Sequence, residues 1–128
     1  MKFNVIAVII AALGAVMVPA AAFAHPELVA ASPAANATVS RTATIKLTFS
    51  ERLTPKLSTA TLTMTGMPGM ANHPDMKMGG ITSTIAADGK SLVLTSTKPL
   101  PAGAYRADWI VAGADTHRVK GAHSFSIK

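Results

Sequence analysis

Apolar and polar residues alternate in short runs from residue 28 onward, and Pro or Gly residues separate the runs. Between residues 44 and 49, the apolar residues Ile45, Leu47 and Phe49 fall on one face, which is the period of a half-buried strand. The pattern predicts strands at residues 28–32, 44–49, 57–65, 81–85, 91–95, 103–113 and 119–127. No run shows a sustained helical period, so we expect an all-β domain.

About seven short strands at spacings of roughly ten residues predict an antiparallel Greek-key β-sandwich or barrel of immunoglobulin-like type. Asp88-Gly89, between two of the predicted strands, is a strong hairpin signal. Residues 66–80 fit no strand pattern and predict one long loop. Long connections in compact domains are usually functional or disordered. We therefore expect a site in this loop. Tyr105 and Trp109 belong to the alternating run at residues 103–113, and we expect both to lie inside the fold.

The first 24 residues have the order of a secretory signal peptide. Lys2 is followed by an apolar run at residues 5–18 and then by Ala22-Phe23-Ala24, with small residues where a signal peptidase reads. A membrane span would need about 20 apolar residues, so an anchor is the weaker interpretation. We expect cleavage after Ala24, a single domain at residues 25–128 and no stable membrane insertion.

Charge and cysteine content exclude several classes of function. The net charge of +6 falls to +5 once Lys2 is removed, and the basic residues form no adjacent run. With one Trp and one Tyr for stacking, we expect no nucleic-acid binding. The chain has no Cys, which excludes disulfides, a Cys nucleophile, an iron–sulfur cluster and a thiolate-based blue-copper centre.

Methionines are concentrated in one part of the chain. Five of the seven lie between residues 64 and 78, among Gly and Pro. Thioethers are soft donors that suit Cu(I), and His73 could add a nitrogen. Two other interpretations stay open: the loop could use Met as adaptable hydrophobic cover, and Met64 has the parity of Leu62 and could belong to the core.

A second candidate metal site begins at His25. Cleavage after Ala24 would give His25 a free α-amine, which can chelate a metal together with its imidazole once both are deprotonated. Pro26 has no N–H, so its amide nitrogen cannot join the chelate. Asp115 and His117 would point to one side of an extended segment and complete a nitrogen and oxygen donor set that suits Cu(II). The alternatives are a turn residue at Asp115 and an ordinary surface histidine at His117.

The remaining polar candidates are weaker. His123 shares the face of Phe125 and Ile127 by alternation, which favours a structural role over metal ligation. Glu27 and Glu51 could support a metal site from further out or have no role.

Taken together, these segments resemble the CopC family of periplasmic copper-resistance proteins. The resemblance is carried by His-Pro-Glu-Leu-Val at residues 25–29, Leu-Thr-Phe-Ser-Glu at 47–51, Met-Pro-Gly-Met within 64–76, Lys-Pro-Leu-Pro-Ala-Gly at 98–103, and Trp109 followed by Asp-Thr-His at 115–117. It covers essentially the whole of residues 25–128. One departure is Asn72, which places His73 one residue later than the family pattern, and Met78 is an additional candidate.

The resemblance implies a cupredoxin-like β-barrel that carries copper in the periplasm. It implies a Cu(II) site at His25, Asp115 and His117, and a Cu(I) site at Met64, Met67, Met70, His73 and Met76. The function expected is copper resistance or homeostasis without catalysis, by sequestration or by transfer to another periplasmic or inner-membrane copper-handling protein. An alternative is a copper mono-oxygenase with an amino-terminal His chelate. A third is an interaction module with incidental histidines.

Overall fold

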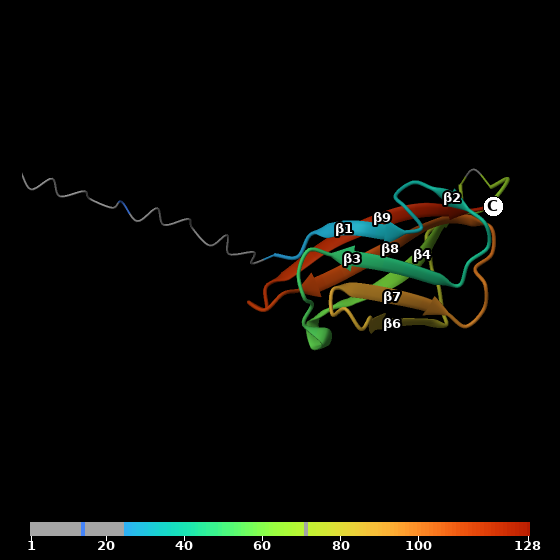
Figure 1. Cartoon of the computed structure of the whole chain (residues 1–128). Coiled ribbons are helices and arrows are strands. Elements are labelled where there is room, and N and C mark those ends of the chain that lie inside the picture. Colours follow the sequence, from blue (N-terminus) through green and yellow to red (C-terminus); the bar gives the residue numbers. More distant parts are fainter. Residues whose placement is uncertain (1–13, 15–24, 71) are drawn as a thin grey trace, which may run out of the picture.

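The computed structural model describes residues 25–70 and 72–128, together with Gly14. The expected signal peptide otherwise lies outside the described residues. Within them the chain forms nine strands and one short 3₁₀ turn: β1 (Leu28–Ser32), β2 (Thr38–Val39), β3 (Thr44–Phe49), η1 (Pro55–Leu57), β4 (Thr59–Gly66), β5 (Met76–Lys77), β6 (Ile81–Ile85), β7 (Ser91–Ser96), β8 (Gly103–Ala112) and β9 (Arg118–Ile127). The prediction of an all-β antiparallel sandwich is confirmed (Figure 1).

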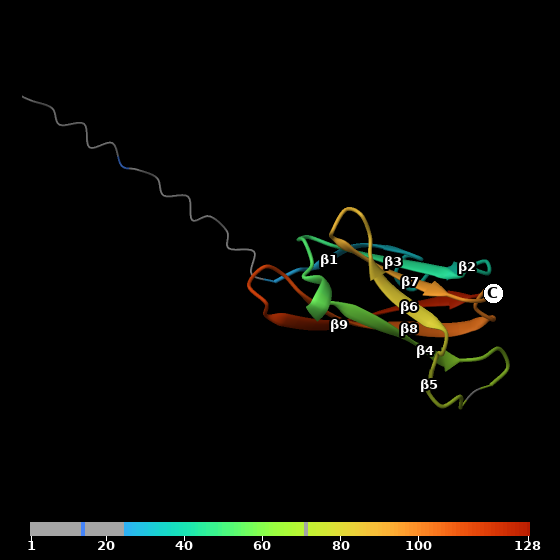
Figure 2. The same cartoon turned by 90° about the horizontal axis from the view of Figure 1, so that it is seen from below.

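The strands form two sheets that face each other. One has the order β1-β3-β7-β6 and the other the order β2-β9-β8-β4-β5. Pairs between the described strands are antiparallel, apart from the parallel pair of β2 with β9. The chain passes from one sheet to the other several times, so neighbouring strands such as β3 and β7 are distant in sequence (Figures 1 and 2). No helix in the described part of the chain is long and apolar enough to cross a bilayer.

The core lies between the two sheets and is filled by the inward residues of the alternating runs. Ile45, Leu47 and Phe49 of β3 are buried, as the pattern predicts. The Phe49 ring meets the Trp109 ring of the opposite sheet edge-on, with centroids 4.9 Å apart. Tyr105 and Trp109 of β8 are both buried, which confirms the prediction that they lie inside the fold.

Residues 66–80 are more ordered than a single long loop. β4 continues to Gly66, and the two-residue strand β5 pairs with it through Thr63 with Lys77 and Met64 with Met76. The prediction of one structureless connection was therefore wrong in this part. β2 was also missed, because two residues are too few to display an alternating period.

Candidate metal centre

His25, Asp115 and His117 lie together at one end of the sandwich. Each offers one potential ligand atom, and these atoms all lie within 4.8 Å of one another. The imidazole rings of His25 and His117 have centroids 5.8 Å apart. Two donors that share a first-row divalent ion at about 2 Å lie at most about 4 Å apart, so small side-chain rotations would bring all three onto one ion.

The turn between β8 and β9 places Asp115 and His117. The Thr116 amide donates to the Gly113 carbonyl over 3.1 Å, and Thr116 has a positive φ of 64°. The sequence analysis expected an extended segment here, and that expectation was wrong, because the segment is a turn. The two side chains nevertheless lie close together, as expected. The reversal at Thr116, together with a hydrogen bond from the His117 amide to Asp115 Oδ1 at 3.2 Å, turns both side chains to one place.

A close packing contact brings the start of the chain to this turn. Pro26 is fully buried, and a Cβ built on Gly113 would lie 3.5 Å from two Pro26 ring atoms and 3.2 Å from Glu51 Oε2. The Glu27 amide donates to Ser50 Oγ at 2.9 Å, and the Ser50 amide donates back to the Glu27 carbonyl at 2.8 Å. His25 is thus held at the site by contacts of the two residues that follow it.

The sequence analysis missed the part played by Gly113. Pro26 and the Glu51 carboxylate pack against Gly113, and its carbonyl accepts hydrogen bonds from Thr54 Oγ1 at 2.8 Å and from Thr116. No local signal in the sequence indicates this, because the contact joins residues that are distant along the chain. Glu51 packs against this glycine and so adds negative charge near the β8–β9 turn.

Asp115 and His117 are hydrogen bonded to each other in the absence of metal. His117 Nδ1 lies 3.0 Å from Asp115 Oδ2. When Nδ1 carries the proton, Nε2 is left as the free lone pair that a metal requires. The donor chemistry of two imidazoles and a carboxylate, all exposed, fits Cu(II).

His123 takes no part in this cluster. It is buried, and its Nε2 lies 2.8 Å from the carbonyl oxygen of Pro33, to which it donates when protonated. The structural role predicted for His123 is confirmed.

The Met-rich segment, residues 64–78, contains a tight turn directly after β4. Met67 and Met70 flank Pro68-Gly69, their backbones form an antiparallel bridge, and the Met70 amide donates to the Met67 carbonyl over 3.1 Å. Gly69 has a positive φ of 76°, as the third residue of a type II turn requires. Residues that flank a two-residue turn project from the same face of the hairpin. Met67 and Met70, which are 40% and 53% exposed, therefore form a pair.

A second pair forms further along the Met-rich segment. Met64 and Met76 are directly opposite in the β4–β5 register and so lie on the same face. Met64 is buried, whereas Met76 is 48% exposed. Met64 therefore belongs to the core, as one interpretation of its parity held, while its neighbour Met76 reaches the surface. Met78 is partly buried against the core.

His73 lies between Met70 and Met76 along the chain. Its Nδ1 atom is buried and has no hydrogen-bond partner among the described residues. An imidazole nitrogen that is shielded from water and left unpaired carries an energetic penalty, which a ligand at that nitrogen would relieve.

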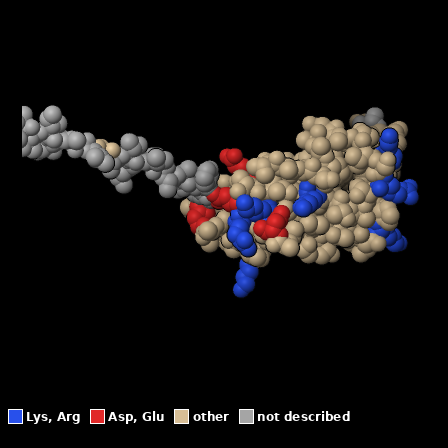
Figure 3. All heavy atoms as spheres, in the orientation of Figure 1, with Lys and Arg blue, Asp and Glu red and all other residues tan. Residues whose placement is uncertain are grey.

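The two candidate sites lie at opposite ends of the sandwich. The described chain begins at one end, beside the β8–β9 turn, and the arm between β4 and β5 extends from the other end (Figures 1 and 2). In the view of Figure 3, Asp and Glu gather at the end where the described chain begins, where they are interleaved with Lys and Arg, and the opposite end shows Lys and Arg.

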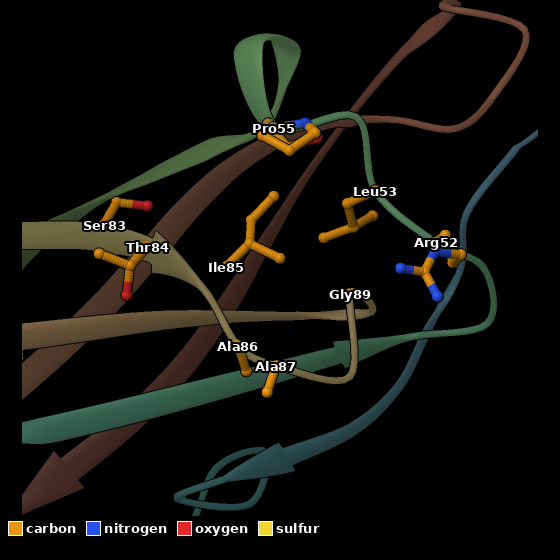
Figure 4. A pocket seen from close by; sticks show the side chains of 10 residues that line it. Arg52, Leu53, Pro55, Ser83, Thr84, Ile85, Ala86, Ala87 and Gly89 are labelled. Carbon is orange, nitrogen blue, oxygen red and sulfur yellow. The ribbon is translucent and has the colours of Figure 1, made fainter.

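A hollow in the surface lies near the end of the sandwich where the described chain begins, because the Leu53 amide donates to the Gly89 carbonyl and the next amide, of Thr54, donates to the carbonyl of Ala112 at the end of β8. It has a volume of about 670 Å³ and opens beside β6, lined by residues that include Arg52, Leu53, Ile85 and Gly89 (Figure 4). Its lining contains none of the predicted metal ligands. The cluster of His25, Asp115 and His117 is exposed and lies outside this hollow.

The fold and the cluster define a β-sandwich protein with a candidate His–Asp–His metal centre at the end of the sandwich where the described chain begins. The CopC domain profile matches residues 28–128, and the chain belongs to the CopC family.

Two relatives are similar over most of their length. The chain is 52% identical to copper resistance protein C of Xanthomonas campestris pv. juglandis over 126 residues, which is 98% of both chains. It is 46% identical to copper resistance protein C of Escherichia coli over 107 residues, which is 84% of both. The crystal structure of PcoC, a methionine-rich copper resistance protein from Escherichia coli, superposes with a TM-score of 0.75 at 44% identity and covers 82% of this chain and all of that one.

Proposed function

We propose that this chain is a periplasmic copper-binding protein for copper resistance or homeostasis, which holds Cu(II) at its mature amino terminus. The proposal rests above all on the convergence of His25, Asp115 and His117, three residues from two distant parts of the chain. Membership of the CopC family and the copper-resistance names of the relatives support copper as the metal.

The Cu(II) site requires removal of the signal peptide after Ala24. His25 then supplies its α-amine and its imidazole, His117 supplies a second imidazole, and Asp115 supplies a carboxylate oxygen. Pro26 supports this arrangement in two ways: it offers no amide nitrogen to the metal, and its burial against Gly113 limits where the amine can go. The imidazole of His25 already lies within 4.8 Å of the ligand atoms of Asp115 and His117, so we expect binding without rearrangement of the sheets.

A second site for Cu(I) in the Met-rich segment is part of the same proposal. Met67 pairs with Met70, and Met76 lies opposite the buried Met64 in the β4–β5 register, so backbone geometry carries the exposed thioethers of Met67, Met70 and Met76 on one arm of the fold. The unpaired Nδ1 of His73 is a suitable nitrogen donor beside them. Cu(I) accepts such soft ligands readily, and the exposure of Met67, Met70 and Met76 allows transfer to a partner protein.

We propose binding without catalysis. In a mono-oxygenase with an amino-terminal His chelate, oxygen needs an open position on the copper. The carboxylate of Asp115 lies within 4.8 Å of the ligand nitrogens of both histidines, so we expect it to fill such a position. If ascorbate and the copper-loaded protein oxidised chitin or cellulose, the mono-oxygenase alternative would replace the binding function.

One experiment tests the Cu(II) site with every side chain unchanged. A chain that begins at His25 is compared with a chain that carries one additional Ala before His25. The extra residue converts the α-amine of His25 into an amide, so we expect the affinity for Cu(II) to fall at least about tenfold. A competition titration with a chromogenic chelator measures the change. Equal affinities would contradict the proposal, and intact-mass measurement of exported protein checks that it begins at His25.

A further inference from the structure

Arg106 joins two carboxylates on the outer face of the five-stranded sheet. Its Nε donates to Asp108 at 2.8 and 3.1 Å, and its Nη1 lies 3.1 Å from Asp75 Oδ2. The hydrogen bond from Arg106 to Asp108 and, to a smaller extent, the hydrogen bond to Asp75 raise the pKa of Arg106, so the guanidinium remains charged. Asp108 is two residues further along β8 and shares its face. It orients the guanidinium and leaves another N–H for Asp75.

The contact with Asp75 reaches across two strand spacings. The register aligns Arg106 of β8 with Thr63 of β4, and Thr63 with Lys77 of β5, a separation of about 10 Å. Thr63 points outward by alternation and is nevertheless buried, in keeping with a side chain that lies over it. Arg106 thus extends from the middle of the sheet to the residue that precedes β5.

This part of the Met-rich segment has few other attachments to the sheet. β5 contains two residues, and beyond it the Met78 amide donates to the Leu62 carbonyl at 2.8 Å. Strands of this length add little stability by themselves. The segment is fixed at its start where Gly66 pairs with Ala104, so a contact at Asp75 closes the loop that carries Met67, Met70 and His73.

We propose that Arg106 is a positioning residue for the Met-rich segment: through Asp75 it holds Met76 and His73 against the sheet, where they are ready to bind Cu(I). Arg106 does not touch the metal. The inference rests on the Cu(I) site proposed above and adds a residue that neither the Met pattern nor the donor chemistry indicates.

The direction in which Cu(I) affinity changes distinguishes a positioning role of Arg106 from the simple effect of its charge on the ion. A positive charge near a Cu(I) site repels the ion, so loss of Arg106 as a mere neighbouring charge would raise the affinity, and loss of Asp75 would lower it. If the Arg106–Asp75 contact instead acts as a tether, loss of either residue releases the same segment and lowers the affinity for Cu(I). The two substitutions should then be non-additive, because each removes the same contact.

The experiment compares Arg106→Gln, Asp75→Asn and the double variant. We expect Cu(I) affinity to fall about two- to five-fold in each, with no further fall in the double variant, as for an exposed charge pair. Arg106→Lys should recover part of the loss, and Cu(II) affinity should stay unchanged. Lys77→Gln is the matched control: it removes a positive charge from β5, and no ion pair to Lys77 is present among the described residues.

Hydrogen exchange of the metal-free protein provides a second measurement. The amides of Lys77 and Met78 should exchange faster in Arg106→Gln and Asp75→Asn than in the Lys77→Gln control. Unchanged exchange, or Cu(I) binding that is equal or tighter in Arg106→Gln, overturns the positioning role. Lack of Cu(I) binding by the unsubstituted chain overturns the Cu(I) site itself, and with it the metal part of this inference.

Discussion

Two histidines of this chain illustrate how burial decides the role of one residue type. His25 is exposed and lies within reach of Asp115 and His117, whereas His123 is buried and paired with the Pro33 carbonyl. Both lie in or beside apolar runs of the sequence. Alternation was enough to assign His123 to the interior, but the neighbours of His25 come from the β8–β9 turn, about ninety residues away, and only the fold reveals them.

The buried histidine gives a prediction about stability. His123→Ala removes the hydrogen bond to Pro33 and leaves that buried carbonyl without its partner, so we expect the free energy of unfolding to fall by about 2 kcal/mol. Denaturant unfolding measures the loss, and Cu(II) affinity should remain that of the unsubstituted chain. A fall in Cu(II) affinity with unchanged stability would show that His123 is a ligand after all.

At the scale of the elements, alternation was sufficient for seven strands and insufficient for two. Each predicted run contains at least three inward residues or a turn signal beside it, whereas β2 and β5 have two residues each and show no period. The Met-rich segment was recognised by its composition. Its pairing with β4 was not, because Gly and Pro within it conceal the two residues that join the sheet.

The same limit applies to the candidate metal centre. The residue types and the spacing of Asp115 and His117 were visible in the sequence, and the reason given for their proximity was wrong. A positive φ at Thr116 and the hydrogen bonds that the Gly113 carbonyl accepts create the geometry, and neither follows from hydrophobic pattern. The sequence therefore indicated which residues to consider and left their arrangement undetermined.

The pairing of β8 with β9 gives a prediction at this scale. Gly121 lies opposite Trp109, and a Cβ at Gly121 would lie 2.1 Å from Trp109 Cζ2. Gly121→Ala should displace the indole from the core and lower the free energy of unfolding by at least about 2 kcal/mol. Thermal and denaturant unfolding test this.

Gly79→Ala serves as the control for that substitution. A Cβ at Gly79 would have no atom within 4 Å, and Gly79 does not have a positive φ. Its stability should change little. Equal stability of the two Ala variants would mean that Trp109 can move without cost, contrary to the tight packing around it.

For the whole molecule, separation of the two candidate sites predicts independent binding. Met67→Leu combined with Met70→Leu removes two exposed thioethers while keeping apolar volume, so Cu(I) affinity should fall about tenfold or more with Cu(II) affinity unchanged. His25→Ala should have the opposite pattern. Titrations of all three proteins with each ion, under reducing and oxidising conditions, measure both affinities. A parallel loss at both sites in either variant would show that the sites are coupled.

The length of β8 sets how copper can move between the two ends. Ten residues at about 3.3 Å each extend roughly 33 Å, and the strand connects the neighbourhood of Gly66 with the turn that carries Asp115. No ion bridges such a gap through a packed core without first entering solvent. Direct transfer between the thioether end of one molecule and the imidazole end of another, without release of the ion, therefore requires a collision of two molecules, with a rate that is second order in protein concentration.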